Sequence, residues 1–428
     1  MKIPASLLAL ALLTPMVASA SQDLLETYRQ AAQNDPELGA ADAGLQAARE
    51  GRPQARSALL PKISATANVA GTHSAGYGGY DSRGFTVTVT QSLYDHKNQA
   101  SLRAADADAA RSESEYNAVA QDLILRVAQA YFDVLGATDS VEFVRAEKKA
   151  IARQLEQARK RFEVGLIAIT DVHEAQAQYD LATASEITAL NEVDSANEAL
   201  RQITERTPEA LAPLGETLVL SRPDPDDLGV WTERALENNP SLKALAYARD
   251  AAQEAIETAK ATFYPSLSLV GSQTHTWANG GPGDGSNDDT KLALQLSAPI
   301  FEGFARGSQV SEAEFNYMAA EENYERERRA VVRAATDAFR GVGAQLARIK
   351  ALEQALVSSR SALKATRAGF DVGTRTIVDV LDAERNMHSA VRDLKRARYD
   401  YILSQLTLFQ AAGHVGEEHL TVINAWLQ

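Results

Sequence analysis

Residues 85–90 have the sequence FTVTVT, in which apolar side chains alternate strictly with threonine. Successive side chains of a β-strand point to opposite faces, so this period of two predicts a strand with one apolar and one polar face. The same alternation occurs between residues 63 and 69, on the other side of a glycine-rich loop. Together the two segments predict a β-hairpin over residues 62–94.

A second pair of alternating segments lies in the other half of the chain. Leu267 and Leu269 alternate with serine, and residues 292–297 have the sequence LALQLS, which predicts a hairpin over residues 265–301. Each strand has roughly ten residues, the length that a tilted strand needs to cross a hydrocarbon layer. Four strands cannot close a barrel, and an open edge is not tolerated in lipid. We therefore expect three chains to supply twelve strands, enough to enclose water.

Long stretches without proline follow each hairpin, over residues 97–163 and 306–371. As helices, each would extend roughly 100 Å at about 1.5 Å per residue. Apolar residues recur every seventh position near the carboxyl end of the second stretch, at Ala335, Val342, Ile349, Leu356, Leu363 and Phe370. The last helix repeats the pattern at Val380, Met387, Leu394, Tyr401 and Leu408. A strict seven-residue period predicts helices that supercoil around one another.

The chain contains two copies of one unit. Residues 34–38, NDPEL, recur as NNPSL at residues 238–242, and the sequence around Gly165 recurs around Gly373. This order predicts a first repeat over residues 21–206 and a second over 230–412, each with a helix, a hairpin, a long helix and a further helix. A connector at 207–229 and a carboxyl-terminal segment at 413–428 complete the organisation, and we expect a few of their residues to pair.

The amino terminus and the composition restrict the location of the protein. Lys2, the apolar residues 7–13 and the small residues 18–20 predict a signal peptide over residues 1–20, so the mature chain is expected to begin near Ser21. No run of 18 apolar residues follows, and there are no cysteines for disulfides, lipid attachment or thiolate chemistry. The net charge of −14 argues against nucleic acid as a partner.

The residues around the two glycines carry a family resemblance. Residues 372–383, VGTRTIVDVLDA, and 164–172, VGLIAITDV, resemble the TolC family of outer-membrane efflux proteins. Residues 130–135, 200–204 and 397–401 extend the similarity, which covers essentially the whole mature chain. The resemblance implies an α+β membrane protein: a homotrimer with a twelve-stranded β-barrel in outer-membrane lipid, continued by a coiled-coil tunnel across the periplasm of a Gram-negative bacterium.

The resemblance also implies a function and partners. The protein would be a passive exit duct for efflux or type I secretion, without cofactor or enzymatic activity, working with a periplasmic adaptor and an inner-membrane transporter. The adaptor would dock at two turns at the periplasmic tip, formed by Val164, Gly165 and Leu166 and by Val372, Gly373 and Thr374. Glycine suits such helix reversals because it tolerates positive φ.

A gate is implied beside these turns. Arg375 would bond to Thr170 and Asp171 on neighbouring helices and hold the inner helices closed, as a guanidinium can satisfy several acceptors. Phe370 occupies the position of a companion tyrosine, so a second bond to Asp171 is not expected. Asp379 and Asp382, three residues apart on one helix face, would form a ring of six carboxylates at the entrance.

Other interpretations of these patterns are open. Aspartates at this spacing are usually solvated surface charges. The acidic residues 280–289 lack the spacing of an EF-hand calcium loop and predict a flexible extracellular loop instead. A structural coiled-coil protein that spans the periplasm without conducting is the alternative function, although the polar strand face argues against a dry core. A hydrolase is least supported, because no nucleophile, carboxylate pair or metal-binding spacing is recognisable.

Overall fold

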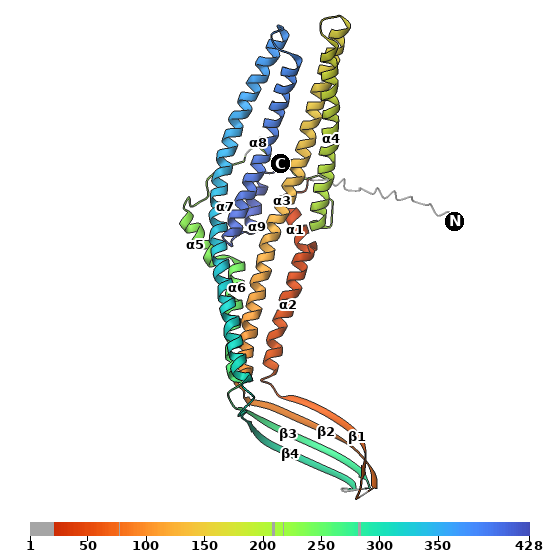
Figure 1. Cartoon of the computed structure of the whole chain (residues 1–428), viewed down its shortest axis with the longest axis vertical. Coiled ribbons are helices and arrows are strands. Elements are labelled where there is room, and N and C mark those ends of the chain that lie inside the picture. The colour runs from red at the N-terminus through yellow and green to blue at the C-terminus, as the bar shows by residue number, and fades with distance from the viewer. Residues whose placement is uncertain (1–20, 77, 208–209, 217, 281–283) are drawn as a thin grey trace, which may run out of the picture.

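The structure is a computed structural model that describes residues 21–428 except 77, 208–209, 217 and 281–283. The predicted signal peptide, residues 1–20, lies outside the described residues. A sheet forms one end of the molecule, and long helices run from it to two helical turns at the other end (Figure 1). In chain order the elements are α1 (Leu24–Asn34), α2 (Pro36–Ser57), β1 (Lys62–Ser74), β2 (Gly78–Tyr94), α3 (His96–Glu163), α4 (Ile169–Thr204), α5 (Leu228–Asn238), α6 (Pro240–Ala261), β3 (Ser266–Asn279), β4 (Gly285–Ser297), α7 (Ala305–Asp371), α8 (Ile377–Ala411) and α9 (Glu417–Asn424).

The four strands form one antiparallel sheet in the order β1-β2-β3-β4. The register of the sheet places apolar and polar side chains on opposite faces. Ile63 lies opposite Val89 on an apolar face, whereas the hydroxyls of Thr86 and Thr274 lie 3.0 Å apart on a face rich in threonine and serine. The hairpins of the two repeats thus lie side by side, with β1 and β4 as the outer edges.

The strands are longer than the roughly ten residues predicted, with 13 residues in β1 and 17 in β2. The prediction of a flexible loop over residues 280–289 is wrong for its second half, because β4 begins at Gly285. Asp288 pairs with His275 in the ladder, and their side chains are hydrogen-bonded. The acidic sequence concealed this part of the strand, since backbone pairing continues beyond the last alternating apolar residue.

Both long helices are continuous, with 68 residues in α3 and 67 in α7. α3 begins after Asp95, whose carboxylate accepts a hydrogen bond from the amide of Lys97. α7 begins instead after Phe304, which has a left-handed φ of +67° and an exposed ring. No helix in the described part of the chain has both the length and the hydropathy required to span a membrane.

The seven-residue pattern forms the contact between helices. On α7, Val342, Ile349 and Leu356 are buried, and on α8, Tyr401 and Leu408 are buried. α7 packs against α8 and α6, while α3 packs against α2, α4, α6 and α8. The two repeats therefore contact each other along α3.

The largest core lies around the middle of the long helices, where α1, α5 and α9 pack (Figure 1). Tyr131, Trp231 and Tyr401 are almost completely buried there. Leu214 forms an isolated antiparallel bridge with Leu427, which is the pairing expected between the connector and the carboxyl-terminal segment. These short elements hold the midpoint of the helices together and leave both ends extended.

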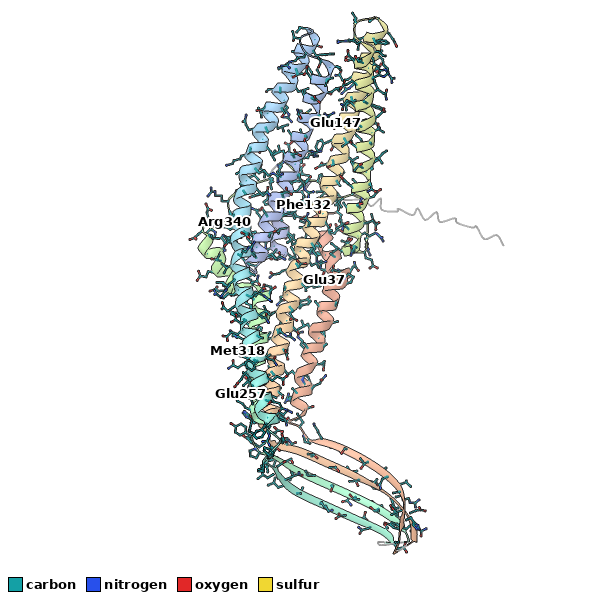
Figure 2. All side chains as sticks on the ribbon, viewed as in Figure 1. Glu37, Phe132, Glu147, Glu257, Met318 and Arg340 are labelled. Carbon is teal, nitrogen blue, oxygen red and sulfur yellow. The ribbon has the colours of Figure 1, made fainter. Side chains whose placement is uncertain are left out.

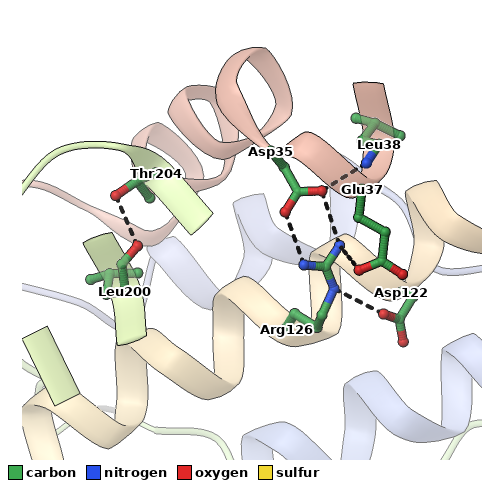
Figure 3. A network of polar contacts seen from close by, with 7 residues as sticks. All are labelled: Asp35, Glu37, Leu38, Asp122, Arg126, Leu200 and Thr204. Carbon is green, nitrogen blue, oxygen red and sulfur yellow. Dashed lines mark hydrogen bonds and ion pairs between the residues drawn. The ribbon is translucent and has the colours of Figure 1, made fainter. Parts of the chain in front are cut away.

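An ion-pair network fixes the start of α2 in the first repeat (Figure 3). The guanidinium of Arg126 donates to both carboxylate oxygens of Asp35, at 2.9 and 3.2 Å, and also pairs with Glu37 and Asp122. Burial by itself would raise the pKa of Asp35, but the hydrogen bond from Arg126 lowers this pKa below its ordinary value. Asp35 therefore remains charged in a site that is almost completely buried.

The second repeat uses the same helix cap without the ion pair. Asp35 accepts a hydrogen bond from the amide of Leu38, and Asn239 accepts the equivalent bond from Leu242 at 3.1 Å. The position equivalent to Arg126 is Ala334, which lines the same small cavity as Asn239. The cap is thus common to both repeats, and the buried charge pair is not.

Candidate functional site

The predicted site residues lie at the end of the molecule farthest from the sheet (Figure 1). One turn joins α3 to α4, and the other joins α7 to α8. The six residues predicted to dock an adaptor are all exposed in these turns: Val164, Gly165, Leu166, Val372, Gly373 and Thr374. The structure therefore places them where a partner can reach them.

The two turns share one backbone geometry. Gly165 has φ +76° and Gly373 has φ +77°, in the left-handed region that favours glycine. The amide of Leu166 donates to the carbonyl of Arg161 at 2.9 Å, and the amide of Thr374 donates to that of Gly369 at the same distance. These bonds across the left-handed residue satisfy carbonyls at the end of each long helix.

The side chains around the turns differ in polarity. The first turn exposes a set of apolar side chains: Phe162, Val164, Leu166 and Ile169. The second exposes Val372 together with the polar Thr374 and Arg375. The α3–α4 turn is thus an apolar surface, and the α7–α8 turn is a polar one.

A capping box starts α8 after the second turn. The amide of Asp379 donates to the hydroxyl of Thr376 at 3.2 Å, and the Asp379 carboxylate accepts from the Thr376 amide at 2.8 Å and hydroxyl at 2.9 Å. The bond from the Thr376 amide is the main cause that lowers the pKa of Asp379, followed by the hydroxyl bond and the charge of Arg375. Asp379 is therefore anionic at neutral pH and oriented by its own helix.

The equivalent cap is missing at α4. Ala168 takes the position of Thr376 and has no side chain that can accept a hydrogen bond. Asp171 takes the position of Asp379, and its amide bonds to the Ala168 carbonyl at 3.2 Å. Among the described residues, no hydrogen bond or ion pair engages the Asp171 carboxylate. This carboxylate is therefore available to a donor from elsewhere.

Arg375 lies close to its own helix in a single chain. Its Nη1 lies 4.0 Å from Oδ1 of Asp379, and its side chain is largely exposed. Within the described residues of one chain, no hydrogen bond or ion pair joins Arg375 to Thr170 or Asp171. The predicted latch thus requires a contact outside the single chain or a change of its rotamer.

Phe370 connects the two helix pairs by packing. The guanidinium of Arg161, on α3, lies 4.6 Å from the centre of the Phe370 ring, on α7. Phe370 also packs against a small core formed by residues of α3, α4 and α8: Ile151, Ala182, Ile377 and Leu381. The position predicted to lack a hydroxyl bond is thus held by a cation–π contact and apolar packing.

Asp382 has a counter-ion that the sequence did not reveal. Its Oδ1 lies 3.3 Å from Nη1 of Arg385, one turn further along α8. Nε of Arg385 also lies 3.5 Å from Oε1 of Glu147 on α3. The carboxylates of Asp379 and Asp382 lie near the start of α8, and each has positive charge beside it.

Sequence signals existed for some of these residues. Thr376 and Asp379 fit the spacing of a capping box, so the box could have been recognised. The contacts of Arg161 and Arg385 cross between helices that are distant in sequence, and no local pattern indicates them. In the described part of the chain, no group of three acidic or histidine side chains is placed to hold a metal ion.

The chain is similar over most of its length to known proteins. A family model described as outer membrane efflux protein matches residues 27–205 and 231–414. The outer membrane protein TolC of Vibrio cholerae serotype O1 is 41% identical over 421 residues, which covers 95% of this chain and 94% of the relative.

A secretion protein and a solved channel are also similar. The alkaline protease secretion protein AprF of Pseudomonas aeruginosa is 30% identical over 423 residues, covering 94% of this chain and 86% of the relative. Among solved structures, the Campylobacter jejuni outer membrane channel CmeC matches with a TM-score of 0.82 and 16% identity, covering 100% of this chain and 98% of that chain. This last likeness establishes the fold.

Proposed function

Since the chain belongs to the outer membrane efflux protein family, we propose that three copies of it form an exit duct that is gated at the helix turns. The protein is an outer-membrane channel of a Gram-negative bacterium for efflux or secretion, and it is a transport protein rather than an enzyme. The four-stranded sheet, with its two outer edges and its two chemically different faces, carries the proposal.

Assembly follows from the edges of the sheet. β1 and β4 each have a row of backbone groups that face away from the sheet, and such groups are costly in hydrocarbon unless they are paired. Pairing β4 of one copy with β1 of the next satisfies both edges. Three copies close a barrel of twelve strands, with the apolar face toward outer-membrane lipid and the threonine-rich face toward water.

The helices near the sheet support the same assembly. Large side chains are exposed on α7, at Phe315 and Met318, and at Phe304 just before it; Phe304 and Phe315 line a cavity of about 870 Å³. α2, which forms the other edge of the helical layer, exposes the small side chains of Ala40, Ala43 and Ala47. Large side chains of α7 would pack against small ones of α2 in the neighbouring copy.

The latch supplies the closed state of the gate. Arg375 would bond to Thr170 and Asp171 of an adjacent helix pair, because its side chain is exposed and the Asp171 carboxylate lacks a helix-capping partner. Opening would swing the α7–α8 pair away from α3–α4, and would break these bonds and the Arg161–Phe370 contact. Reversible widening requires bonds of modest strength, and exposed ion pairs have that strength.

The acidic entrance selects for cations. Three copies of Asp379 and Asp382 would place six carboxylates around the narrow end of the tunnel, where converging negative charge concentrates cations. The low pKa of Asp379 keeps its carboxylate ionised throughout the physiological range.

A periplasmic adaptor would dock on the turns and connect the duct to an inner-membrane transporter. The apolar side chains of Val164 and Leu166 offer the kind of surface that helical hairpins bind. The transporter would supply energy and select the cargo. The similarity to the protease secretion protein AprF supports protein export beside efflux of small compounds.

Planar bilayers containing the purified protein test this proposal. We expect small, cation-selective current steps from the wild type, and steps roughly twofold to fivefold larger from Arg375→Ser, since an exposed ion pair is worth up to about 1 kcal/mol. Lys160→Ser, which removes an exposed ion pair within α3, is the matched control and should conduct like the wild type.

Two results would contradict the proposal. Absence of current from a folded trimer would favour a structural protein that does not conduct. Equal currents from Arg375→Ser and the wild type would keep the duct and remove Arg375 from its gate.

A further inference from the structure

We propose that Arg385 is a clamp within each chain that holds the α7–α8 pair against the α3–α4 pair and partly neutralises the acidic entrance. This inference rests on the proposed gated duct and names a residue that adds to the control of its opening. No local sequence pattern indicates such a role, because the partners of Arg385 come from three helices.

The contacts of Arg385 define the clamp. Nη1 lies 3.3 Å from Oδ1 of Asp382 on α8, and Nε lies 3.5 Å from Oε1 of Glu147 on α3. Nη2 donates to Oε1 of Gln178 on α4. A planar guanidinium can serve three acceptors in fixed directions. One side chain thus connects the start of α8 to both α3 and α4.

The position of the clamp makes it relevant to opening. Glu147 lies in the half of α3 that approaches the helix turns (Figure 2). Other bonds from α8 to α3 lie nearer the midpoint of the helices, where Lys395 pairs with Asp139 and Arg396 pairs with Asp133. Among the ion pairs of the described residues that join α8 to α3, that of Arg385 is therefore closest to the turns.

The core around the midpoint keeps α8 on α3, so separation of the helix pairs must begin at the turns. The small apolar core of Ile151 and Leu381 lies in this region, and the Arg385–Glu147 pair flanks it. Neither side chain of the pair is fully buried, so water can replace the bond when the helices separate. The clamp is suited to repeated opening and closing.

The charges around Arg385 give it a second effect. Asp382 and Glu147 contribute two negative charges, and Arg385 contributes one positive charge between them. Removing Arg385 would leave both carboxylates without that counter-ion and strengthen the attraction of the entrance for cations. Loss of the clamp should therefore raise conductance and tighten cation block together. A residue that only stabilised the fold would not produce the second effect.

The test uses the full-length trimer in planar bilayers with hexaamminecobalt(III) as the blocking cation. Arg385→Gln should enlarge the current steps roughly twofold to fivefold, the range of a partly exposed ion pair, and should lower the blocking concentration by a similar factor. Arg392→Gln is the matched control, because the hydrogen bonds and ion pairs of Arg392 among the described residues are with Ser389 and Asp393 of its own helix.

A double-mutant cycle identifies the partner. Glu147→Gln should enlarge the current steps as Arg385→Gln does, and the double variant should conduct no more than either single variant. Fully additive effects would overturn the pairing with Glu147. Arg385→Gln steps and block equal to those of Arg392→Gln would overturn the clamp while the duct stands. Absence of wild-type current would overturn the duct and the clamp with it.

Discussion

The turn between α3 and α4 and the turn between α7 and α8 have the same backbone, yet the helices that follow them begin differently. Thr376 caps α8 and binds the carboxylate of Asp379. Ala168 holds the same place before α4, and its side chain offers no hydrogen bond to the carboxylate of Asp171. One difference at the cap position therefore gives two equivalent aspartates different hydrogen bonding.

This difference would allow one duplicated motif to supply both halves of the proposed gate. A carboxylate held by its own helix is a fixed charge, suited to an entrance ring, whereas a carboxylate free of such bonds can accept a latch from another helix. The two turns also differ in polarity, and this difference fits the same division between the repeats. The apolar α3–α4 turn is suited to docking, and the polar α7–α8 turn is suited to gating.

The largest expected effect comes from neutralising the paired acidic residues of one repeat and comparing the result with the same change in the other. Asp379→Asn/Asp382→Asn should weaken block by a trivalent cation roughly 100-fold or more, because six carboxylates leave a confined site. Bilayer currents measured over a range of cation concentrations give the blocking constant.

The counterpart variant is Asp171→Asn/Glu174→Gln, at the equivalent positions of α4. It should retain cation block and increase the basal current, because Asp171 is proposed as a latch acceptor. If it abolished block as well, the two repeats would share one function and the comparison would fail.

The next effect concerns docking at the turns. Leu166→Ser should reduce affinity for the cognate adaptor about tenfold, as expected for an exposed apolar anchor, whereas Val372→Ser should reduce it only about twofold to threefold. Surface plasmon resonance with the immobilised trimer measures both. Equal losses would mean that the adaptor does not distinguish the apolar turn from the polar one.

A smaller effect should follow from giving the first turn the cap of the second. Ala168→Thr would create a capping box with Asp171, worth about 1 kcal/mol, and divert that carboxylate from the latch. We expect the basal current to rise about threefold to fivefold. Ala168→Val has nearly the same shape but no hydroxyl, so it is the control. A rise in both variants would indicate packing rather than capping.

The reverse substitution tests the second turn. Thr376→Val removes the box, so amide exchange in the first turn of α8 should accelerate about fivefold, which corresponds to about 1 kcal/mol. Hydrogen–deuterium exchange with mass spectrometry measures it. Thr183→Val, which alters a threonine inside α4, should leave the start of α8 unchanged. Unaltered exchange in Thr376→Val would show that the box contributes little.

The smallest effect is a pH dependence. The pKa of Asp379 is lowered from 3.8 in the folded chain, so the bonds of its carboxylate are intact above that value and are lost as the pH falls through the lowered pKa. Cation block should therefore change less than about twofold between pH 7 and pH 5, and weaken only below about pH 3.8. A loss of block near pH 5 would mean that Asp379 is not held in this way.

Local periodicity was sufficient to predict most of the fold. The alternation around residues 85–90 indicates which side chains share one face of the sheet. The seven-residue spacing through Val342 and Ile349 does the same for a helix, and these faces determine how the elements pack. The limits of the strands were less predictable. Residues 285–289 pair through their backbones, and backbone pairing leaves no trace in the hydropathy of acidic side chains.

Some site residues could likewise be predicted from the sequence, and others could not. The turns around Gly165 and Gly373 were predicted from the family resemblance of the sequence around them, and glycine suits their left-handed backbone. The pairing of Arg385 with Glu147 was not, since it depends on which helices become neighbours after the chain has folded. The latch from Arg375 to Asp171 stays a prediction, because a single chain does not bring the two together.

The buried pair of Asp35 and Arg126, found in the first repeat only, has a mechanical consequence. Breaking a buried ion pair is costly, so α2 is fixed to α3 in one position, whereas Asn239 and Ala334 impose no such penalty on α6 and α7. We expect the first repeat to stay in place and the second repeat to move when the channel opens. In a duct assembled from three such chains, the three second repeats would then rotate against a rigid ring formed by the three first repeats.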